Sequence, residues 1–215
     1  MSQIILDFGS GNNCLNDKKI IKKMYDELKA IDNKKHSIVC KWQLFKRAGK
    51  NVPLLPENFD FAYKYGTNLG YNVTSSVFDK PSLDLLLKYN PCFIKIANRR
   101  DLDWLIGEIP RKIPVYISYG KIEEFFNSKY QDNIGKLICV SEYPSKIEKY
   151  QNIINEIESL LECNLTLKIS DHTIGLDLFK NHKPYIWEKH YKLSDSMGLD
   201  AGPFAITPEE LKEIL

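Results

Sequence analysis

The sequence predicts an α/β protein folded as a compact TIM (β/α)8 barrel, with residues 1–215 forming a single domain. Two observations lead to this prediction. Strand-like apolar runs alternate with amphipathic segments along the whole chain, and polar residues recur at the carboxyl ends of those runs. Strict alternation implies parallel strands joined by right-handed crossovers. About eight βα units is the number found in a TIM barrel, although a doubly wound open sheet is an alternative.

The strands are predicted from apolar runs and from alternation of apolar and polar residues. In LTLKISDH, Leu165, Leu167 and Ile169 alternate with polar residues, which is the period of a strand. The predicted strands cover 4–9, 37–43, 72–78, 92–97, 114–120, 136–143, 165–170 and 185–191.

The segments between the strands have helical patterns with interleaved charges, which are typical of solvated helix faces. The predicted helices cover 17–30, 57–69, 81–88, 101–108, 121–128, 146–161 and, more weakly, 174–180. The final segment, TPEELKEIL (207–215), begins with Thr207 as N-cap, Pro208 at the first helical position and Glu210 two positions later. This spacing predicts a capping box.

The composition is that of an ordinary globular protein, with 43% hydrophobic residues, 27% charged residues and a net charge of +2. The sequence has no basic stripe with interleaved aromatic residues, so it gives no indication of a nucleic-acid partner. No apolar run predicts a membrane span, and the first residues do not resemble a signal peptide. The five cysteines lack CxxC spacing, and we interpret Cys40, Cys92 and Cys139 as reduced core residues. We therefore expect a cytoplasmic protein with neither nucleic-acid nor membrane partners.

Two of the four histidines lie at the ends of consecutive predicted strands. Ser170 and His172 share one strand face, and Glu188 and His190 share another, because side chains two apart point the same way. Parallel neighbours ending in this way would bring two imidazoles together above oxygen ligands, which predicts an open site for a divalent metal. Two hydrogen-bonded histidines without a metal are the alternative interpretation.

Other strand ends are also polar. Lys95 lies inside the apolar run FIKIA, and an ammonium group directed into a barrel must find an anion. Together with Lys41 it predicts a pocket for phosphate or carboxylate. The polar residues at the remaining strand ends are Asp7, Gln43, Ser76, Ser141 and Tyr143.

Several motifs match a known family in order and spacing. The strongest are SDHTIG (170–175), EKHYKL (188–193) and LDAGPFAITPEELKEIL (199–215), and KWQLFK, SSVFDKPSLDLL, FIKIANRRDLDWLI, ISYG and CVSEYP are weaker matches. With gaps, the chain resembles the catalytic barrel of the sialic acid synthase family from Ile4 to Leu215. That family includes N-acetylneuraminate, legionaminate and pseudaminate synthases.

The resemblance implies a transferase that condenses phosphoenolpyruvate with an N-acylated hexose or related aldose to a nonulosonic-type α-keto sugar acid. It implies a divalent metal on His172 and His190, with Mn²⁺ preferred and Mg²⁺, Co²⁺ or Zn²⁺ as alternatives. The implied catalytic residues are Asp7, Lys41, Lys95 and Glu188. The implied substrate-binding residues are Gln43, Ser76, Asn98, Ser141, Tyr143, Ser170 and Asp200. A homodimer is also compatible with the resemblance.

The sequence departs from the family pattern at several positions. Asn98 and Arg100 stand where the family has a serine and a glutamate. If Arg100 points into the pocket, it would bind a substrate carboxylate; if it points away, the site lacks that acid. A sugar- or phosphate-binding barrel without catalysis, or another metal-dependent aldolase or lyase, therefore remains an alternative function.

The resemblance covers the catalytic barrel alone. We expect a compact form that lacks the family's C-terminal antifreeze-like domain. The segment 44–59 is the predicted substitute for a lid over the site, with Lys46, Arg47 and Lys50 facing an anionic or polyhydroxylated ligand.

Overall fold

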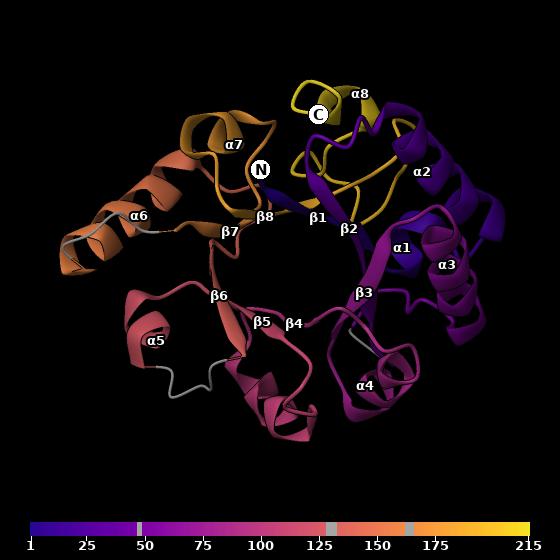
Figure 1. The fold of residues 1–215 in the computed structure, drawn as a ribbon, viewed down its shortest axis with the longest axis horizontal. Coiled ribbons are helices and arrows are strands. Elements are labelled where there is room, and N and C mark those ends of the chain that lie inside the picture. The colour runs from indigo at the N-terminus through magenta and orange to yellow at the C-terminus, as the bar shows by residue number, and fades with distance from the viewer. Residues whose placement is uncertain (47–48, 128–132, 162–165) are drawn as a thin grey trace.

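The computed structural model describes residues 1–46, 49–127, 133–161 and 166–215, and shows a closed barrel of eight parallel strands. The strands follow one another around the barrel in sequence order, and the helices surround them (Figure 1). The TIM barrel predicted from the sequence is confirmed. The strands are β1 (Gln3–Gly9), β2 (Ser37–Leu44), β3 (Asn72–Val77), β4 (Ile94–Ile96), β5 (Val115–Tyr119), β6 (Ile134–Cys139), β7 (Lys168–Asp171) and β8 (Ile186–His190).

Most helices lie where the amphipathic patterns predict them. They are α1 (Gly11–Cys14), α2 (Lys18–Ile31), α3 (Pro56–Asn68), α4 (Lys80–Leu87), η1 (Arg100–Glu108), α5 (Ile122–Asn127), α6 (Ile147–Leu161), α7 (Asp177–His182) and α8 (Pro208–Leu211). The short α1 was not predicted, and the helix expected at 101–108 is a 3₁₀ helix. A 3₁₀ helix rises more per residue than an α-helix, so nine residues reach further between β4 and β5.

The predicted capping box at the last helix is confirmed. The Thr207 hydroxyl accepts a hydrogen bond from the Glu210 backbone N–H at 3.3 Å, and the Glu210 carboxylate accepts from the Thr207 N–H at 2.8 Å. The preceding chain returns to the barrel through Ile206, whose N–H donates to the His190 carbonyl at 2.8 Å. The capped helix thereby fixes the segment that closes one side of the barrel mouth.

Some neighbouring strands pair over only one or two residues close to the positions of the predicted site residues. Strand β3 pairs with β4 at Ser76 and Lys95, and β6 ends at Cys139 after pairing that residue with Ser170. Ser141 therefore lies beyond the end of β6, in contrast to the predicted strand 136–143. An early end frees the chain to turn across the barrel mouth, because backbone outside the ladder is no longer held in the sheet.

The barrel interior changes from apolar to polar along its axis. Its lower part is filled by an apolar cluster of Ile5, Val39, Phe93, Leu137 and Ile186. Two residues further along β1 and β8, the inward positions hold Asp7 and Glu188, because side chains two apart share a face. The apolar layer closes the barrel below, so the polar layer opens at the carboxyl ends of the strands, as active sites of this fold do.

The cysteine interpretation needs one correction. Cys40 and Cys139 are buried, whereas Cys92 is exposed at the amino-terminal edge of β4. The short β4 places this residue before the strand, outside the sheet core. Cys163 lies outside the described residues, and the four described cysteines are free thiols. None of the helices in the described ranges has the length and apolar character needed to cross a bilayer.

Candidate active site

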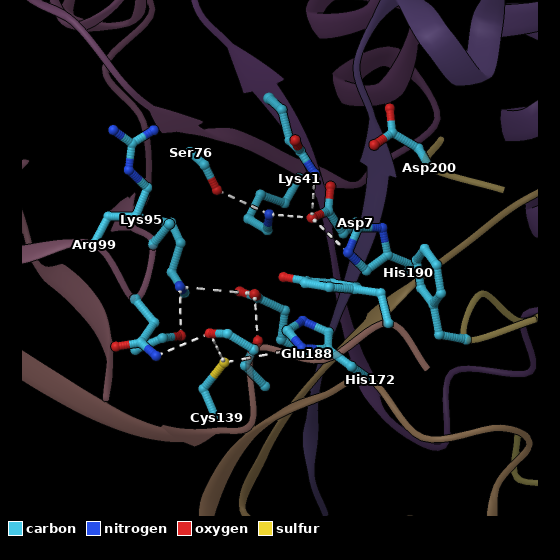
Figure 2. A pocket seen from close by; sticks show the side chains of 18 of the residues that line it. Asp7, Lys41, Ser76, Lys95, Arg99, Cys139, His172, Glu188, His190 and Asp200 are labelled. Atoms are coloured by element: carbon cyan, nitrogen blue, oxygen red, sulfur yellow. Dashed lines mark hydrogen bonds and ion pairs between the residues drawn. The ribbon is translucent and has the colours of Figure 1, made fainter. Parts of the chain in front are cut away.

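All residues predicted for the site line one cavity of about 540 Å³ at the carboxyl ends of the strands (Figure 2). They are Asp7, Lys41, Gln43, Ser76, Lys95, Asn98, Ser141, Tyr143, Ser170, His172, Glu188, His190 and Asp200. The cavity has two walls of different chemistry. We call β2–β5, with Lys41, Ser76, Lys95 and Ser118, the lysine wall. We call the opposite group of His172, His190, Tyr143 and Phe204 the histidine wall.

Lys41 is a buried cation with its counterion in place. Its ammonium donates to Asp7 Oδ2 at 2.6 Å and to the Ser76 hydroxyl at 2.9 Å, while Gln43 also donates to Asp7 Oδ2 at 2.9 Å. Although burial disfavours the carboxylate, the Lys41 ammonium holds the pKa of Asp7 well below its usual range. Burial opposes the ammonium in the same way, but Asp7 raises the pKa of Lys41. The two charges therefore support each other in a buried pair.

Lys95 is buried with weaker support. Its ammonium donates to the Ser118 hydroxyl at 2.7 Å and lies 3.7 Å from Glu188 Oε1. Burial lowers the pKa of Lys95, and Glu188 only partly offsets this. Glu188 Oε1 accepts from the Ser170 hydroxyl at 3.0 Å, whereas its buried Oε2 has no hydrogen-bond partner within the described part of the chain. A bound anion beside Lys95 would supply negative charge that the protein itself provides only in part.

His172 is held as one neutral tautomer. Its Nδ1 lies 2.7 Å from the Val140 carbonyl oxygen, which can only accept, so Nδ1 carries the proton and Nε2 keeps its lone pair. Burial, followed by the neighbouring His190, lowers the pKa of His172 to about 3. The ring therefore stays neutral at physiological pH and can act as a ligand through Nε2.

His190 completes the histidine wall. Its ring centroid lies 5.7 Å from that of His172, and its Nε2 lies 3.8 Å from Asp7 Oδ2. Nδ1 of His190 is buried and has no hydrogen-bond partner among the residues described. The Tyr143 ring contacts His172 with centroids 4.1 Å apart and planes tilted by 34°, and Phe204 meets His190 edge-on at 4.9 Å. These aromatic rings restrict access of water to both imidazoles.

The two imidazoles fit a divalent metal with open coordination positions. A backbone carbonyl that fixes the second ring nitrogen, as Val140 does for His172, is the usual support of a histidine ligand. The orphaned, buried Nδ1 of His190 indicates a missing partner. Within the described ranges, no group of three or more His, Cys, Asp and Glu residues could hold a metal. Water or substrate would therefore have to supply the remaining ligands.

Arg100 does not line the cavity. Its guanidinium donates to the carbonyl oxygens of Ala97 (3.3 Å) and Ser118 (2.9 Å), and lies 4.5 Å from the centroid of the Tyr119 ring. Arg99 lines the cavity instead and stands at its edge in Figure 2, paired with Asp101. Of the two orientations considered for Arg100, the structure shows the one that turns away from the site.

The side chain of Asn98, a neutral amide, lines the cavity two residues before Arg100. Its Nδ2 donates to the Ser141 hydroxyl at 2.9 Å, and its Oδ1 accepts from the Gly120 N–H at 3.2 Å.

On the other side of the cavity mouth, Asp200 Oδ2 accepts from the N–H and hydroxyl of Ser10, both at 2.8 Å. Asp200 therefore ties the segment after β8 to the turn after β1.

The sequence reasoning missed several cavity residues. Ser118 holds Lys95, but it lies inside the run PVYISYG rather than at its end. Strand alternation could have found it, because Ser118 is two positions beyond the inward Tyr116. Nothing in the local sequence pointed to Arg99, Phe204 or Asn51, which reach the cavity from connecting segments.

The predicted lid segment 44–59 is partly fixed. The Val52 N–H donates to Asn12 Oδ1 at 3.0 Å, and the Leu55 N–H donates to Asn16 Oδ1 at 2.9 Å. Asn12 also donates to Asn51 at 3.0 Å. These bonds attach 51–55 to the segment after β1, and the Lys46 N–H donates to Asp79 Oδ2 at 2.7 Å. Arg47, one of its predicted contacts, lies outside the described residues.

Comparison with known proteins gives the family. The model of the NeuB family matches residues 20–215. The chain belongs to the NeuB family. The resemblance to sialic acid synthases predicted from the motifs is thus confirmed. No curated protein sequence matches the chain.

Solved structures share the fold of this NeuB-family chain. A sialic acid synthetase from Leptospira borgpetersenii has a TM-score of 0.80 at 22% identity, over 98% of this chain and 80% of that one. A putative spore coat polysaccharide biosynthesis protein E from Chromobacterium violaceum has a TM-score of 0.78 at 19% identity, over 99% and 72%. A phospho-2-dehydro-3-deoxyheptonate aldolase from Thermotoga maritima has a TM-score of 0.66 at 15% identity, over 99% and 67%. At these identities the likeness establishes the barrel fold.

Proposed function

We propose that this NeuB-family chain condenses phosphoenolpyruvate with an N-acylated hexose or related aldose, forming a nonulosonic-type α-keto sugar acid. The observation that supports this most is the placement of two buried lysines opposite two buried histidines in one cavity. Phosphoenolpyruvate carries a phosphate and a carboxylate, which Lys41 and Lys95 would bind by charge-assisted hydrogen bonds. The family membership supports a sugar-acid synthase as the reaction class.

In the proposed reaction, carbon 3 of phosphoenolpyruvate bonds to the aldehyde carbon, and the aldehyde oxygen takes up a proton as it becomes a hydroxyl. Water adds at carbon 2, and the carbon–oxygen bond to phosphate breaks, leaving the α-keto acid and inorganic phosphate. A divalent metal on His172 and His190, preferably Mn²⁺, would supply Lewis-acid polarisation of the aldehyde when bound. Lys41 and Lys95 stabilise the anionic groups throughout.

Glu188 is the residue best placed to handle a proton. Its Oε1 is fixed by Ser170, while the buried Oε2 lacks a hydrogen-bond partner in the described structure. A carboxylate oxygen in this state can accept a proton from the water that adds at carbon 2. Tyr143, Phe204 and Asp200 line the side of the cavity beside the histidines, where the sugar would bind.

Phosphate release from phosphoenolpyruvate tests this proposal. The chain is incubated with phosphoenolpyruvate, Mn²⁺ and a panel of N-acyl hexosamines and other aldoses, and the α-keto acid is detected by mass spectrometry. We expect phosphate release that requires one of the sugars and a product mass equal to the sugar plus phosphoenolpyruvic acid plus water minus phosphoric acid. His190→Ala is the inactive control, and Arg100→Ala, altered outside the cavity, is the matched active control.

A barrel that binds these ligands without turning them over is the second candidate function. The observation that favours it is the absence, among the described residues, of an acid at one part of the cavity lining. Asn98 supplies an amide and Ser141 a hydroxyl there, and Arg100 is turned away from the cavity. Binding of phosphoenolpyruvate by calorimetry, with no phosphate released for any sugar in the panel, would support this function over synthesis.

A further inference from the structure

An ion pair lies directly behind the two histidines, on the outer face of the barrel. Asp171 precedes His172 at the end of β7, and Lys189 precedes His190 on β8. Asp171 and Lys189 are register partners in the parallel pair of strands. Because successive side chains alternate, both point outward where the histidines point into the cavity. Both side chains are fully buried, and the Lys189 ammonium lies 3.2 Å from Asp171 Oδ2.

The pair holds the chain on both sides of His172. Asp171 Oδ1 accepts hydrogen bonds from the N–H and the hydroxyl of Thr173, both at 2.7 Å. The Lys189 ammonium donates to the Thr173 carbonyl at 2.6 Å, and Trp187 Nε1 donates to Asp171 Oδ2 at 2.9 Å. The residues before and after His172 are thus tied to the strand that carries His190.

Stability alone does not account for this arrangement. Taking two charges out of water is costly, and apolar replacements of a buried ion pair are often neutral or stabilising. Aromatic rings pack beside the pair, with the centroids of Phe179 and Trp187 4.8 Å apart. A buried pair of this kind is better explained by the geometry it imposes on neighbouring groups.

We propose that Asp171 and Lys189 are positioning residues that set the separation and orientation of His172 and His190 for one divalent cation. This inference rests on the metal site of the proposed function. Neither residue touches the cavity. They act through the backbone, in the way that groups behind metal ligands commonly tune metal affinity.

The test is a Mn²⁺ titration of the full chain followed by electron paramagnetic resonance, with thermal unfolding measured in EDTA. The double variant Asp171→Asn/Lys189→Met removes both charges at similar volume and keeps an acceptor for Thr173. We expect it to fold and to bind Mn²⁺ roughly 10–100-fold more weakly than the wild type. A merely structural role would lower the unfolding temperature without changing Mn²⁺ affinity in the folded protein.

A matched pair of tryptophan variants decides the question if the double variant does not fold. Trp187 and Trp42 are both fully buried. Trp42 lies on β2, and its Nε1 donates to the Tyr25 hydroxyl at 3.1 Å, a hydrogen bond that does not involve the Asp171–Lys189 pair. Trp187→Phe should weaken Mn²⁺ binding several-fold, whereas Trp42→Phe should not. Equal Mn²⁺ affinity in Trp187→Phe, Trp42→Phe and wild type would overturn the positioning role alone. Absence of Mn²⁺ binding by the wild type would instead overturn the metal site and this inference with it.

Discussion

The lysine wall and the histidine wall of the cavity differ in how completely their polar groups are paired. On the lysine wall, Lys41 donates to Asp7 and Ser76, and Lys95 donates to Ser118. On the histidine wall, His172 bonds through one ring nitrogen only, and the buried Nδ1 of His190 has no hydrogen-bond partner within the described ranges. The lysine wall therefore holds its ammonium groups in place before an anion arrives, although the charge of Lys95 is compensated less well than that of Lys41. The histidine wall is where we propose that a metal completes the site.

Removing an imidazole should have the largest effect on function. We expect His172→Ala or His190→Ala to abolish Mn²⁺ binding and to lower kcat/KM by on the order of 1,000-fold, the upper range for loss of an electrostatic group in an active site. Circular dichroism should show an intact fold, because neither ring is part of the apolar core clusters. Unchanged Mn²⁺ affinity in both variants would contradict the assignment of the histidine wall.

Replacing each lysine in turn should distinguish an effect on phosphoenolpyruvate binding from an effect on protein stability. Lys95→Met should raise the KM for phosphoenolpyruvate by roughly 100-fold, with little change in unfolding temperature, because the weakly supported charge no longer has to be buried. Lys41→Met should weaken binding as well, but it leaves Asp7 as an unpaired buried carboxylate. Breaking a buried pair costs about 3–5 kcal/mol of unfolding free energy. Normal phosphoenolpyruvate binding by Lys95→Met would show that the lysine wall is not the anion site.

Acid should destabilise the protein through the histidine wall. The pKa of His172 is lowered from 6.5 to about 3 by folding, so between these values the unfolded state binds a proton that the folded state does not. The unfolding free energy should therefore fall as pH drops below 6.5, by about 2 kcal/mol at pH 5. Urea unfolding in EDTA at pH 7 and pH 5 measures this difference. The variant His172→Gln should lose this part of the pH dependence, and an equal slope in both proteins would count against a buried neutral ring.

The smallest expected effect distinguishes two adjacent arginines at the edge of the lysine wall. Arg99 lines the cavity, so Arg99→Ala should raise the KM for phosphoenolpyruvate a few-fold, as loss of an exposed charge contact does. Arg100→Ala should leave KM unchanged and lower the unfolding free energy by about 1 kcal/mol, through loss of its contact with the Tyr119 ring. Steady-state kinetics and urea unfolding of both variants test this. A larger effect of Arg100→Ala on KM would mean that its guanidinium enters the cavity.

Strand ends were the part of the site that the sequence could predict. In a parallel barrel, every strand delivers its carboxyl end to the same opening, so Asp7, Lys41, Lys95 and His190 could be assigned to one cavity from alternation alone. Residues that reach the cavity from connections, such as Phe204 and Arg99, could not be found in this way. Their positions depend on how each connection folds back, which no periodicity encodes.

The sequence by itself indicated about eight βα units and a polar rim, because alternating strands and helices admit few arrangements. The tertiary structure excluded the doubly wound sheet, since β8 closes on β1. Only the tertiary structure decided the partners of those polar groups. Adjacent residues show the difference. Arg99 and Arg100 are the same amino acid, yet one lines the cavity and the other bonds to the carbonyls of Ala97 and Ser118. Local sequence gives two neighbouring residues nearly the same preferences, and the surrounding strands determine which side chain faces the site.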